Sequence, residues 1–478
     1  MRRLSTFSVA ASLAVLGTSA CNDFLSSNKV KVDPNNPSSA TADQLFVTVQ
    51  AAQFAQQEGI VALIGCLWLQ QCTGTSNFLQ TLEKYDIASE DTPSAAFSSI
   101  YEGGGLVDIR QIEAAETAAG DLQYLGIAQM WEVLDMAVAA DIYGDVPYRE
   151  AAGSAATPHL DPQAQVYSDL QALLDQAITN LSGAGPGPLS GHDLVYNGNT
   201  SKWIDAAHTL KARLFMHTAE TATGFDNTAL NNAVTNALLG IKAGNDLKSK
   251  HTSQPGEDNL WFQFYDRSGF GQYVVAGQHL ADLMNLRNDP RRAEYFGPAV
   301  PGPGFGGQGP PPGNTTSPAG VSSLTGTRNS PTFSQPIVTY IENQLILAEA
   351  YFRLDGNALR AQAPFDAARA SVPGLAPKVI TWINDIMEEK YVAMYQNIEV
   401  WNDYKRSCYP AITAIQPPTA PATFGGKVPG RLYYGTTEQN ANPNVPDRSV
   451  QNQDGGNIVT TPPANAGFRN PNDPNPCP

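Results

Sequence analysis

The segment 341–373 constrains the fold most, because it has the spacing of two short helices that pack closely against each other. Small side chains let two helices approach, and an aromatic ring fills the space beside them. The residues with this spacing are Leu347, Ala348 and Tyr351 in the first half, and Ala361, Phe365, Ala368 and Pro373 in the second. Their order follows the tetratricopeptide pattern, with a turn that is one residue longer. The segment therefore predicts antiparallel helix pairs.

Much of the remaining chain also has a helical pattern. Gly144 and Pro147 should end the clearest helix, and Asp161 with Pro162 supplies an N-cap and a first-turn proline for the next. The apolar run 60–69 is too short to span a membrane. Apolar residues at helical spacing predict helices over 43–58, 122–142, 161–181 and 201–221. We therefore expect an all-α fold, a tetratricopeptide-like superhelix of helix pairs with a less regular portion of loops and short elements.

The N-terminus has the features of an export signal. Arg2 and Arg3 precede a short apolar run at 7–17, and small residues lead to Cys21. A run of this length favours a cleaved signal over a transmembrane helix. We expect a lipoprotein signal peptide at 1–20, lipid on Cys21 and a flexible tether at 21–39. Secretory cleavage without lipid is the alternative, since Thr18 stands where an aliphatic residue is usual.

Composition indicates an acidic body with a large core. Lys and Arg number 29 against 45 Asp and Glu, which gives a net charge of -16. Nucleic acid is excluded as a partner, because phosphate neutralisation needs clustered Lys and Arg. With 42% hydrophobic residues the chain can bury a large core in one or two domains. We expect one helical domain over 40–478, with a long loop at 297–330 and an irregular tail at 435–478.

Four cysteines besides Cys21 indicate an oxidising compartment. We favour disulfides between Cys66 and Cys72, which are close in sequence, and between Cys408 and Cys477, which would hold the tail. Four free, buried thiols are the alternative. The chain has no CxxC pair, so no metal site is predicted.

Motifs spread from start to end of the chain resemble those of the SusD/RagB family, surface lipoproteins that capture nutrients for outer-membrane import. In chain order they lie at 21–25, 141–148, 202–204 with 210–214, 289–291, 347–350, 399–406, 409–410 and 429–434. Three features depart from the family pattern: Thr18, Lys405 where a second arginine is common, and a Gly/Pro-rich insert at 297–313.

The resemblance implies a lipid-anchored protein of the outer membrane that faces the cell exterior. Such a protein binds a polysaccharide or oligosaccharide, or a peptide, and passes it to a SusC-like TonB-dependent barrel without chemistry or cofactor. A surface-anchored glycoside hydrolase is the competing hypothesis, because two distant carboxylates could form its site. However, the chain has no HExxH or GxSxG motif. The third hypothesis is a scaffold that binds only the transporter and has no ligand of its own.

Aromatic residues at 259–273 are the candidate ligand site, because flat rings can stack on the apolar faces of sugars. The candidates are Trp261, Phe264, Tyr265, Arg267 and Phe270, of which we expect Trp261, Tyr265 and Arg267 to be exposed. Trp68 and Tyr85 are second-rank candidates. The alternative is that most of these rings lie in the core. Asp141 and Asp145 could suggest a cation site, but a helix exit at Gly144 explains that motif more simply.

Overall fold

The computed structural model of the chain describes residues 41–75, 77–85, 91–153, 155–183, 185, 191–263, 273–300, 321–325, 327–413, 415, 428–432, 434–446 and 477. Within these residues the fold is all-α with short strands, which confirms the predicted class. The predicted signal peptide 1–20, Cys21 and the tether 21–39 lie outside them. Among the described helices none is long and apolar enough to cross a membrane.

The helices lie at the following positions in the chain. The first group is α3 (Ala42–Glu58), α4 (Ile60–Trp68), α5 (Asn77–Glu83), α6 (Asp91–Tyr101), α7 (Leu106–Ala119), α8 (Leu122–Tyr143), α9 (Gln163–Leu181), α10 (Thr200–His217) and α11 (Asn227–Ala237). The second group is α12 (Leu260–Phe262), α13 (Gln278–Leu286), α14 (Arg292–Tyr295), α15 (Tyr340–Asp355), α16 (Gln362–Ala370), α17 (Ile383–Ala393), α18 (Glu399–Ser407) and α19 (Thr436–Ala441).

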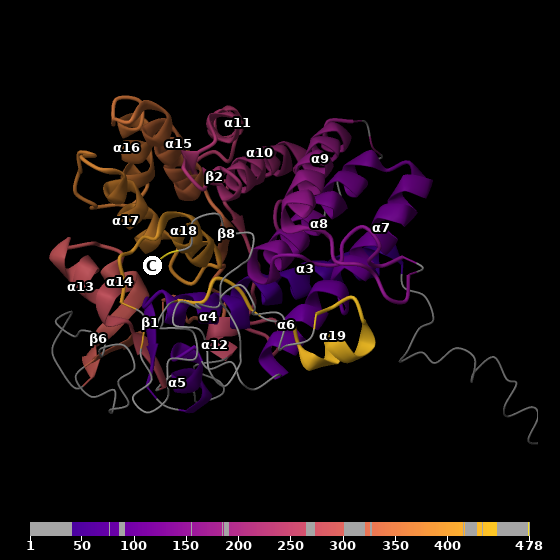
Figure 1. Cartoon of the computed structure of the whole chain (residues 1–478), viewed down its shortest axis with the longest axis horizontal. Coiled ribbons are helices and arrows are strands. Elements are labelled where there is room, and N and C mark those ends of the chain that lie inside the picture. Colours follow the sequence, from indigo (N-terminus) through magenta and orange to yellow (C-terminus); the bar gives the residue numbers. More distant parts are fainter. Residues whose placement is uncertain are drawn as a thin grey trace, which may run out of the picture.

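Helix pairs form the upper part of the molecule in Figure 1, where α8 packs on α9, α10 on α11 and α15 on α16. The predicted pair at 341–373 is confirmed as α15 and α16. Ala348 of α15 is buried against Phe365 and Ala368 of α16, while Leu347 and Ala350 face the neighbouring pair. Because α15 is buried on both sides, it joins successive pairs into the superhelix that the spacing predicted.

Helices α8 and α9 cross closely at a glycine. A Cβ atom on Gly126 would lie 2.8 Å from Cγ of Leu181 and 3.1 Å from the carbonyl oxygen of Ala177. Only a residue without a side chain fits this crossing. The alanine-rich composition of α8 serves the same close packing, since 20 of its 22 residues are buried.

The start of α9 differs from the prediction. The helix begins at Gln163 with Pro162 as its N-cap residue, so the prediction that Asp161 caps it is wrong. The Asp161 carboxylate instead accepts hydrogen bonds from the backbone nitrogens of Tyr148, at 3.0 Å, and Arg149, at 2.8 Å. The carboxylate that binds the first turn of α9 is that of Asp145, because its Oδ1 accepts the backbone N–H of Gln163 at 2.9 Å. The helix predicted over 201–221 ends at His217, and its last two predicted residues form a strand.

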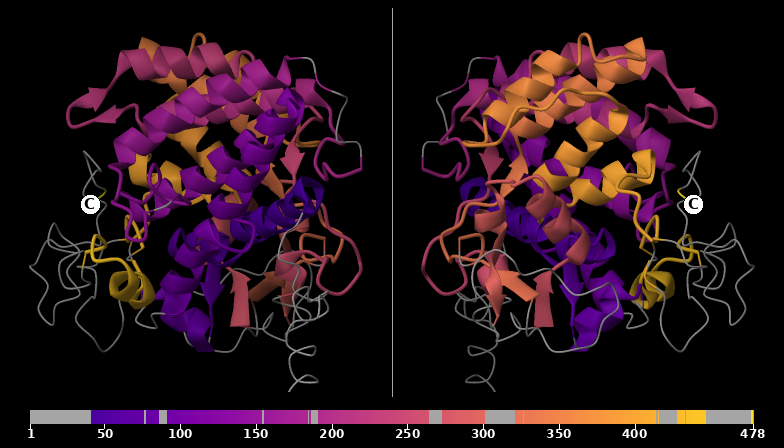
Figure 2. Two further views of the ribbon diagram at one scale, coloured as in Figure 1. Left: turned by 90° about the vertical axis from the view of Figure 1, so that its right-hand side faces the viewer. Right: turned by 90° about the vertical axis from the view of Figure 1, so that its left-hand side faces the viewer.

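The strands of a small sheet lie below the helix pairs in Figure 2. A four-stranded antiparallel sheet has the order β1 (Cys72–Gly74), β5 (Val274–Ala276), β7 (Val321–Leu324) and β6 (Phe296–Val300). Two ribbons pair β2 (Glu220–Thr221) with β3 (Gly224–Phe225), and β4 (Leu247–Lys248) with β8 (Pro336–Val338).

Two regions predicted to be irregular contain regular structure. The ends of the predicted loop 297–330 belong to β6 and β7, because β7 finds backbone partners in both β5 and β6. Its middle, 301–320, lies outside the described residues. The predicted tail 435–478 begins with helix α19, which rests on α6, while 447–476 lies outside the described residues.

Both favoured cysteine pairs are disulfides in the structure. Cys66 of α4 is bonded to Cys72 of β1, and Cys408, directly after α18, is bonded to Cys477 near the chain end. The second bond closes a long loop, so it holds the end of the chain on the helical body.

Candidate functional site

The motif at the end of α8 is built as a helix exit. Gly144 ends the helix with a φ of +86°, a conformation that favours glycine. Asp145 then binds the first turn of α9, and Val146 forms an isolated bridge with Asp161. The carbonyl oxygen of Pro147 accepts the hydroxyl hydrogen of Tyr101 at 2.9 Å. The motif therefore positions α9 and α6 relative to α8.

Residues 428–432 and 434–446 lie across this exit and are bonded to it. The backbone N–H of Leu432 donates to the carbonyl of Ile142 at 2.8 Å, and Nε1 of Trp401 donates to the carbonyl of Pro429 at 2.9 Å. The ring of Tyr434 stacks on that of Tyr143, with centroids 5.9 Å apart. These contacts place α19 beside α6, and Figure 1 shows the two helices next to each other.

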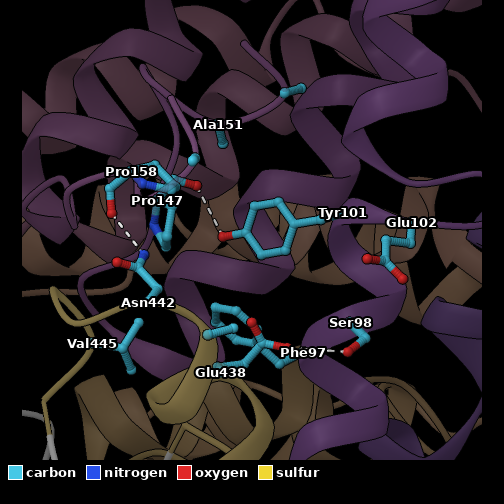
Figure 3. Close-up of a pocket in the computed structure, with 13 residues that line it drawn as sticks. Phe97, Ser98, Tyr101, Glu102, Pro147, Ala151, Pro158, Glu438, Asn442 and Val445 are labelled. Atoms are coloured by element: carbon cyan, nitrogen blue, oxygen red, sulfur yellow. Dashed lines mark hydrogen bonds between the residues drawn. The ribbon is translucent and has the colours of Figure 1, made fainter. Parts of the chain in front are cut away.

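A cavity of about 200 Å³ lies between α6 and α19. Its wall comes from α6, from the segment that follows α8 and from the 438–445 segment, which lie around it in Figure 3. The lining residues are Phe97, Ser98, Tyr101, Glu102, Pro147, Ala151, Ala152, Ala156, Pro158, Glu438, Ala441, Asn442 and Val445. Ligand pockets usually measure about 300–1,000 Å³, so this cavity suits one ring of a larger molecule whose remainder stays outside.

The cavity combines an aromatic face with hydrogen-bonding groups. Tyr101 is partly exposed as a residue, and its ring lies 5.1 Å from that of the buried Phe97. Oγ of Ser98 donates to Oε1 of Glu438 at 3.2 Å, and Nδ2 of Asn442 donates to the carbonyl of Pro158 at 2.8 Å. An aromatic face beside hydroxyl and carboxylate groups can bind a sugar, whose ring has both apolar and polar surfaces.

The charge of one cavity carboxylate, Glu102, acts on the other, Glu438. Partial burial raises the pKa of Glu438, the hydrogen bond from Ser98 partly offsets this, and the charge of Glu102 raises the pKa further. Glu102 itself is exposed. A positively charged or hydrogen-donating group in the cavity would therefore be favoured.

A second cavity, of about 340 Å³, lies on the other side of α6, between α3, α4 and α8. The described part of its lining is mostly apolar and contains no charged residue. Its residues are Ala52, Ala55, Gln56, Ile60, Val61, Ala95, Ala96, Ser99, Ile100, Gly103, Val138, Ile142 and Tyr143. With few polar groups it cannot orient a sugar, so the first cavity is the candidate site.

Residues 34–358 match the protein family SusD-like_2, described as "Starch-binding associating with outer membrane". The chain belongs to the SusD-like family. This membership confirms the family that the motifs implied and makes the chain a binding protein, not an enzyme. No curated protein sequence matches it.

Solved structures share the fold of this SusD-like chain. A SusD/RagB family protein from Bacteroides thetaiotaomicron VPI-5482 is 21% identical, with a TM-score of 0.67 over 85% of this chain and 95% of that one. A chitin-binding protein is 22% identical, with a TM-score of 0.70 over 84% and 94%. A chitin-binding SusD homologue from Flavobacterium johnsoniae is 18% identical, with a TM-score of 0.68 over 89% and 96%. At these identities the likeness shows the fold alone.

The described residues contradict part of the predicted ligand site of the SusD-like chain. Trp261 is only 3% exposed, so the prediction that it faces solvent is wrong. Asn259 caps the short helix α12 and thereby turns Trp261 into the core below α3. The second-rank candidates Trp68 and Tyr85 are buried as well, with their rings packed edge to face. Phe264, Tyr265, Arg267 and Phe270 lie outside the described residues.

The sequence interpretation missed the residues that line the cavity, among them Ser98, Tyr101 and Glu438. They come from segments about 340 positions apart, and no local pattern links them. Two family motifs pointed to this region: 141–148 contains the lining residue Pro147, and 429–434 precedes the segment that places Glu438 beside α6.

Asp141, His217 and Glu399 lie close enough together to suggest a metal site. However, Nδ1 of His217 is 3.0 Å from Asp141 and Nε2 is 2.7 Å from Glu399, so both ring nitrogens already face carboxylates. Oδ1 of Asp141 also accepts the hydroxyl hydrogen of Tyr167, and Asn402 donates to Oδ2. The cluster is explained as a buried ion-pair group that joins α8, α9, α10 and α18.

Proposed function

We propose that this SusD-like protein captures a glycan at the cell surface and delivers it to a SusC-like, TonB-dependent barrel in the outer membrane. Family membership supports the glycan-binding role. The carrying observation is the cavity between α6 and α19, in which the partly exposed Tyr101 lies beside Ser98, Glu102 and Glu438. Two solved structures with this fold are described as chitin-binding, which supports a polysaccharide ligand. The barrel receives the ligand after capture, without any chemical step.

The aromatic face of the cavity provides the first test. The purified chain is run through gels that contain starch, chitin-derived or other polysaccharides, and both retardation and release of shorter sugars are measured. A fully covered aromatic ring buries about 150–250 Å², and Tyr101 is already partly covered, so its further burial contributes about 1.4 kcal/mol. Tyr101→Ala should therefore weaken binding to the retarding glycan about tenfold.

Tyr101→Phe is the matched control, because it keeps the ring and removes only the hydroxyl that binds Pro147. It should retain most of the affinity. Unchanged retardation in Tyr101→Ala would reject this cavity as the site. Release of shorter sugars would contradict the binding role itself.

Membrane attachment is the second part of the proposal and depends on Cys21. Several acyl chains, at about 0.8 kcal/mol per buried methylene, would hold the protein without a spanning helix. We expect Cys21→Ser to move the protein from the outer-membrane fraction to the soluble fraction, and Cys21→Ser cells to lose labelling by a membrane-impermeant reagent at the surface. A variant that stays in the membrane fraction would contradict the lipid anchor.

Delivery requires contact with the barrel. Mild cross-linking of cells that express the native chain should join it to a large TonB-dependent outer-membrane protein. Recovery of the chain free of any such protein would contradict delivery and leave only capture.

A further inference from the structure

The charge of the candidate cavity narrows the class of glycan, on the condition that the proposed function holds. Glu102 and Glu438 are the acidic residues among the 13 described residues that line it, and none of these 13 is Lys, Arg or His. Sites for acidic sugars need cationic side chains that neutralise carboxylate or sulfate groups. The charged side chains of this cavity are carboxylates instead, which repel such groups.

Two described cations close to the cavity wall already have carboxylate partners. Arg110, which donates to the carbonyl of Ala151 in the cavity wall, forms an ion pair with Glu132 at 3.2 Å. Arg149, near the same wall, forms an ion pair with Asp169 at 2.7 Å. Neither side chain lines the cavity, so no described side chain of the wall neutralises the field of its two carboxylates.

The hydrogen-bonding groups of the cavity also favour a ligand that donates hydrogen bonds. Ser98 already donates to one oxygen of Glu438, and Asn442 donates to the carbonyl of Pro158. Tyr101 likewise donates its hydroxyl hydrogen to the carbonyl of Pro147. Ionised carboxylates only accept hydrogen bonds, so the groups left for a ligand are mainly acceptors. An ammonium group has three N–H donors and a positive charge, and it can also lie over the face of an aromatic ring such as Tyr101.

The net charge of the whole chain also favours a positively charged ligand. A net charge of -16 repels polyanionic glycans and attracts polycationic ones before contact. Salt screens this long-range part, whereas contacts inside a partly buried cavity are screened less.

We propose that the cavity between α6 and α19 binds an amine-bearing hexose unit, as in glucosamine oligomers, with its ammonium group in the field of the Glu102 and Glu438 carboxylates and its ring against Tyr101. The matching N-acetylated unit has no charge and only one N–H donor on that nitrogen, so it binds in the same place with lower affinity. Uronic-acid oligomers are excluded by repulsion from the two carboxylates.

Calorimetric titration of the full chain with three oligomers of equal length tests this. Glucosamine oligomers should bind about tenfold more tightly than N-acetylglucosamine oligomers at low salt, and uronic-acid oligomers should not bind. Glu438→Gln and Glu102→Gln should each weaken glucosamine binding about five- to tenfold and leave binding of the N-acetylated oligomer unchanged. Because Glu102 is exposed and Glu438 is at the edge of the core, both variants should fold.

Asp366→Asn is the matched control. Asp366 is exposed on α16 and outside the cavity lining, and the substitution makes the same change in net charge. It should leave all three affinities unchanged. An equal loss in Asp366→Asn and Glu438→Gln would overturn the inference, because it would show long-range attraction only. Tight binding of the N-acetylated oligomer that is insensitive to both glutamate substitutions would also overturn it, while leaving the proposed glycan capture standing. Failure of every glycan to bind would overturn both.

Discussion

Replacing Arg406 with methionine should lower the free energy of unfolding by about 3 kcal/mol, the lower end of the cost of breaking a buried ion pair. Arg406 of α18 contacts Glu349 of α15 through two bonds, Nη1 to Oε1 at 2.5 Å and Nη2 to Oε2 at 2.6 Å. Glu349 is fully buried, so the substitution would leave its charge in the core. Because Arg353 still contacts Glu349 at 2.7 Å, the loss of unfolding free energy stays at the lower end of that cost.

The pKa of Glu349 shows how much this carboxylate depends on its partners. Burial acts to raise that pKa, but Arg406 and Arg353 outweigh it and hold the pKa well below the usual value. The carboxylate therefore stays charged in the core, where an unpaired charge is costly.

Denaturant unfolding of the two variants Arg406→Met and Arg360→Met makes a matched comparison. Arg360 pairs with Asp355 on the surface, where both side chains reach solvent, and exposed pairs contribute little. Arg360→Met should leave the unfolding midpoint almost unchanged. If the two variants lose equal stability, the α15–α18 ion pair is not a main contributor. The double variant Glu349→Leu/Arg406→Met should recover part of the loss, because it removes both charges.

The same ion pairs explain why the motif at 399–406 could be recognised in the sequence but not interpreted. Glu399, Asp403 and Arg406 are charged and yet buried, because each forms an ion pair with an opposite charge on another helix. Lys405, a departure from the family pattern, lies over the ring of Trp401 at 4.8 Å and donates to the carbonyl of Asp141. Partners so far apart in sequence leave no local pattern.

Local spacing was sufficient where the interaction itself is local. The pair α15–α16, helices α3 and α8, and the two disulfides depend on residues that are close in sequence or on a limited set of pairings. Trp261 shows the limit of such reasoning. Composition marked it as a ring for sugar binding, but burial below α3 depends on where Asn259 starts a helix relative to the rest of the fold. Exposure is a property of the assembled core and not of the segment.

His217 should make the stability of the protein depend on pH above neutrality. Burial acts to lower the pKa of His217, but the charges of Asp141 and Glu399 outweigh it and raise that pKa to about 9, from 6.5. A histidine whose pKa is raised in the folded state stabilises the protein fully below the unfolded value, and loses this contribution as pH rises through the folded value. The contribution is about 3 kcal/mol, since a tenfold change in an acid dissociation constant corresponds to about 1.4 kcal/mol. It should disappear between about pH 6.5 and pH 9.

The difference in unfolding free energy between the wild type and His217→Gln isolates the contribution of His217. Glu113, whose pKa is raised to about 9 by burial and by the charge of Glu132, also lowers stability as pH rises, so the slope of the wild type alone is ambiguous. Denaturant unfolding from pH 6 to pH 10 should show His217→Gln less stable at pH 6, with a difference that shrinks by about 3 kcal/mol towards pH 10. His159→Gln, at an exposed histidine, should follow the wild type throughout. A difference that stays constant with pH would mean that His217 is neutral in the folded protein and that Asp141 and Glu399 are held by Tyr167, Asn402 and Arg213 instead.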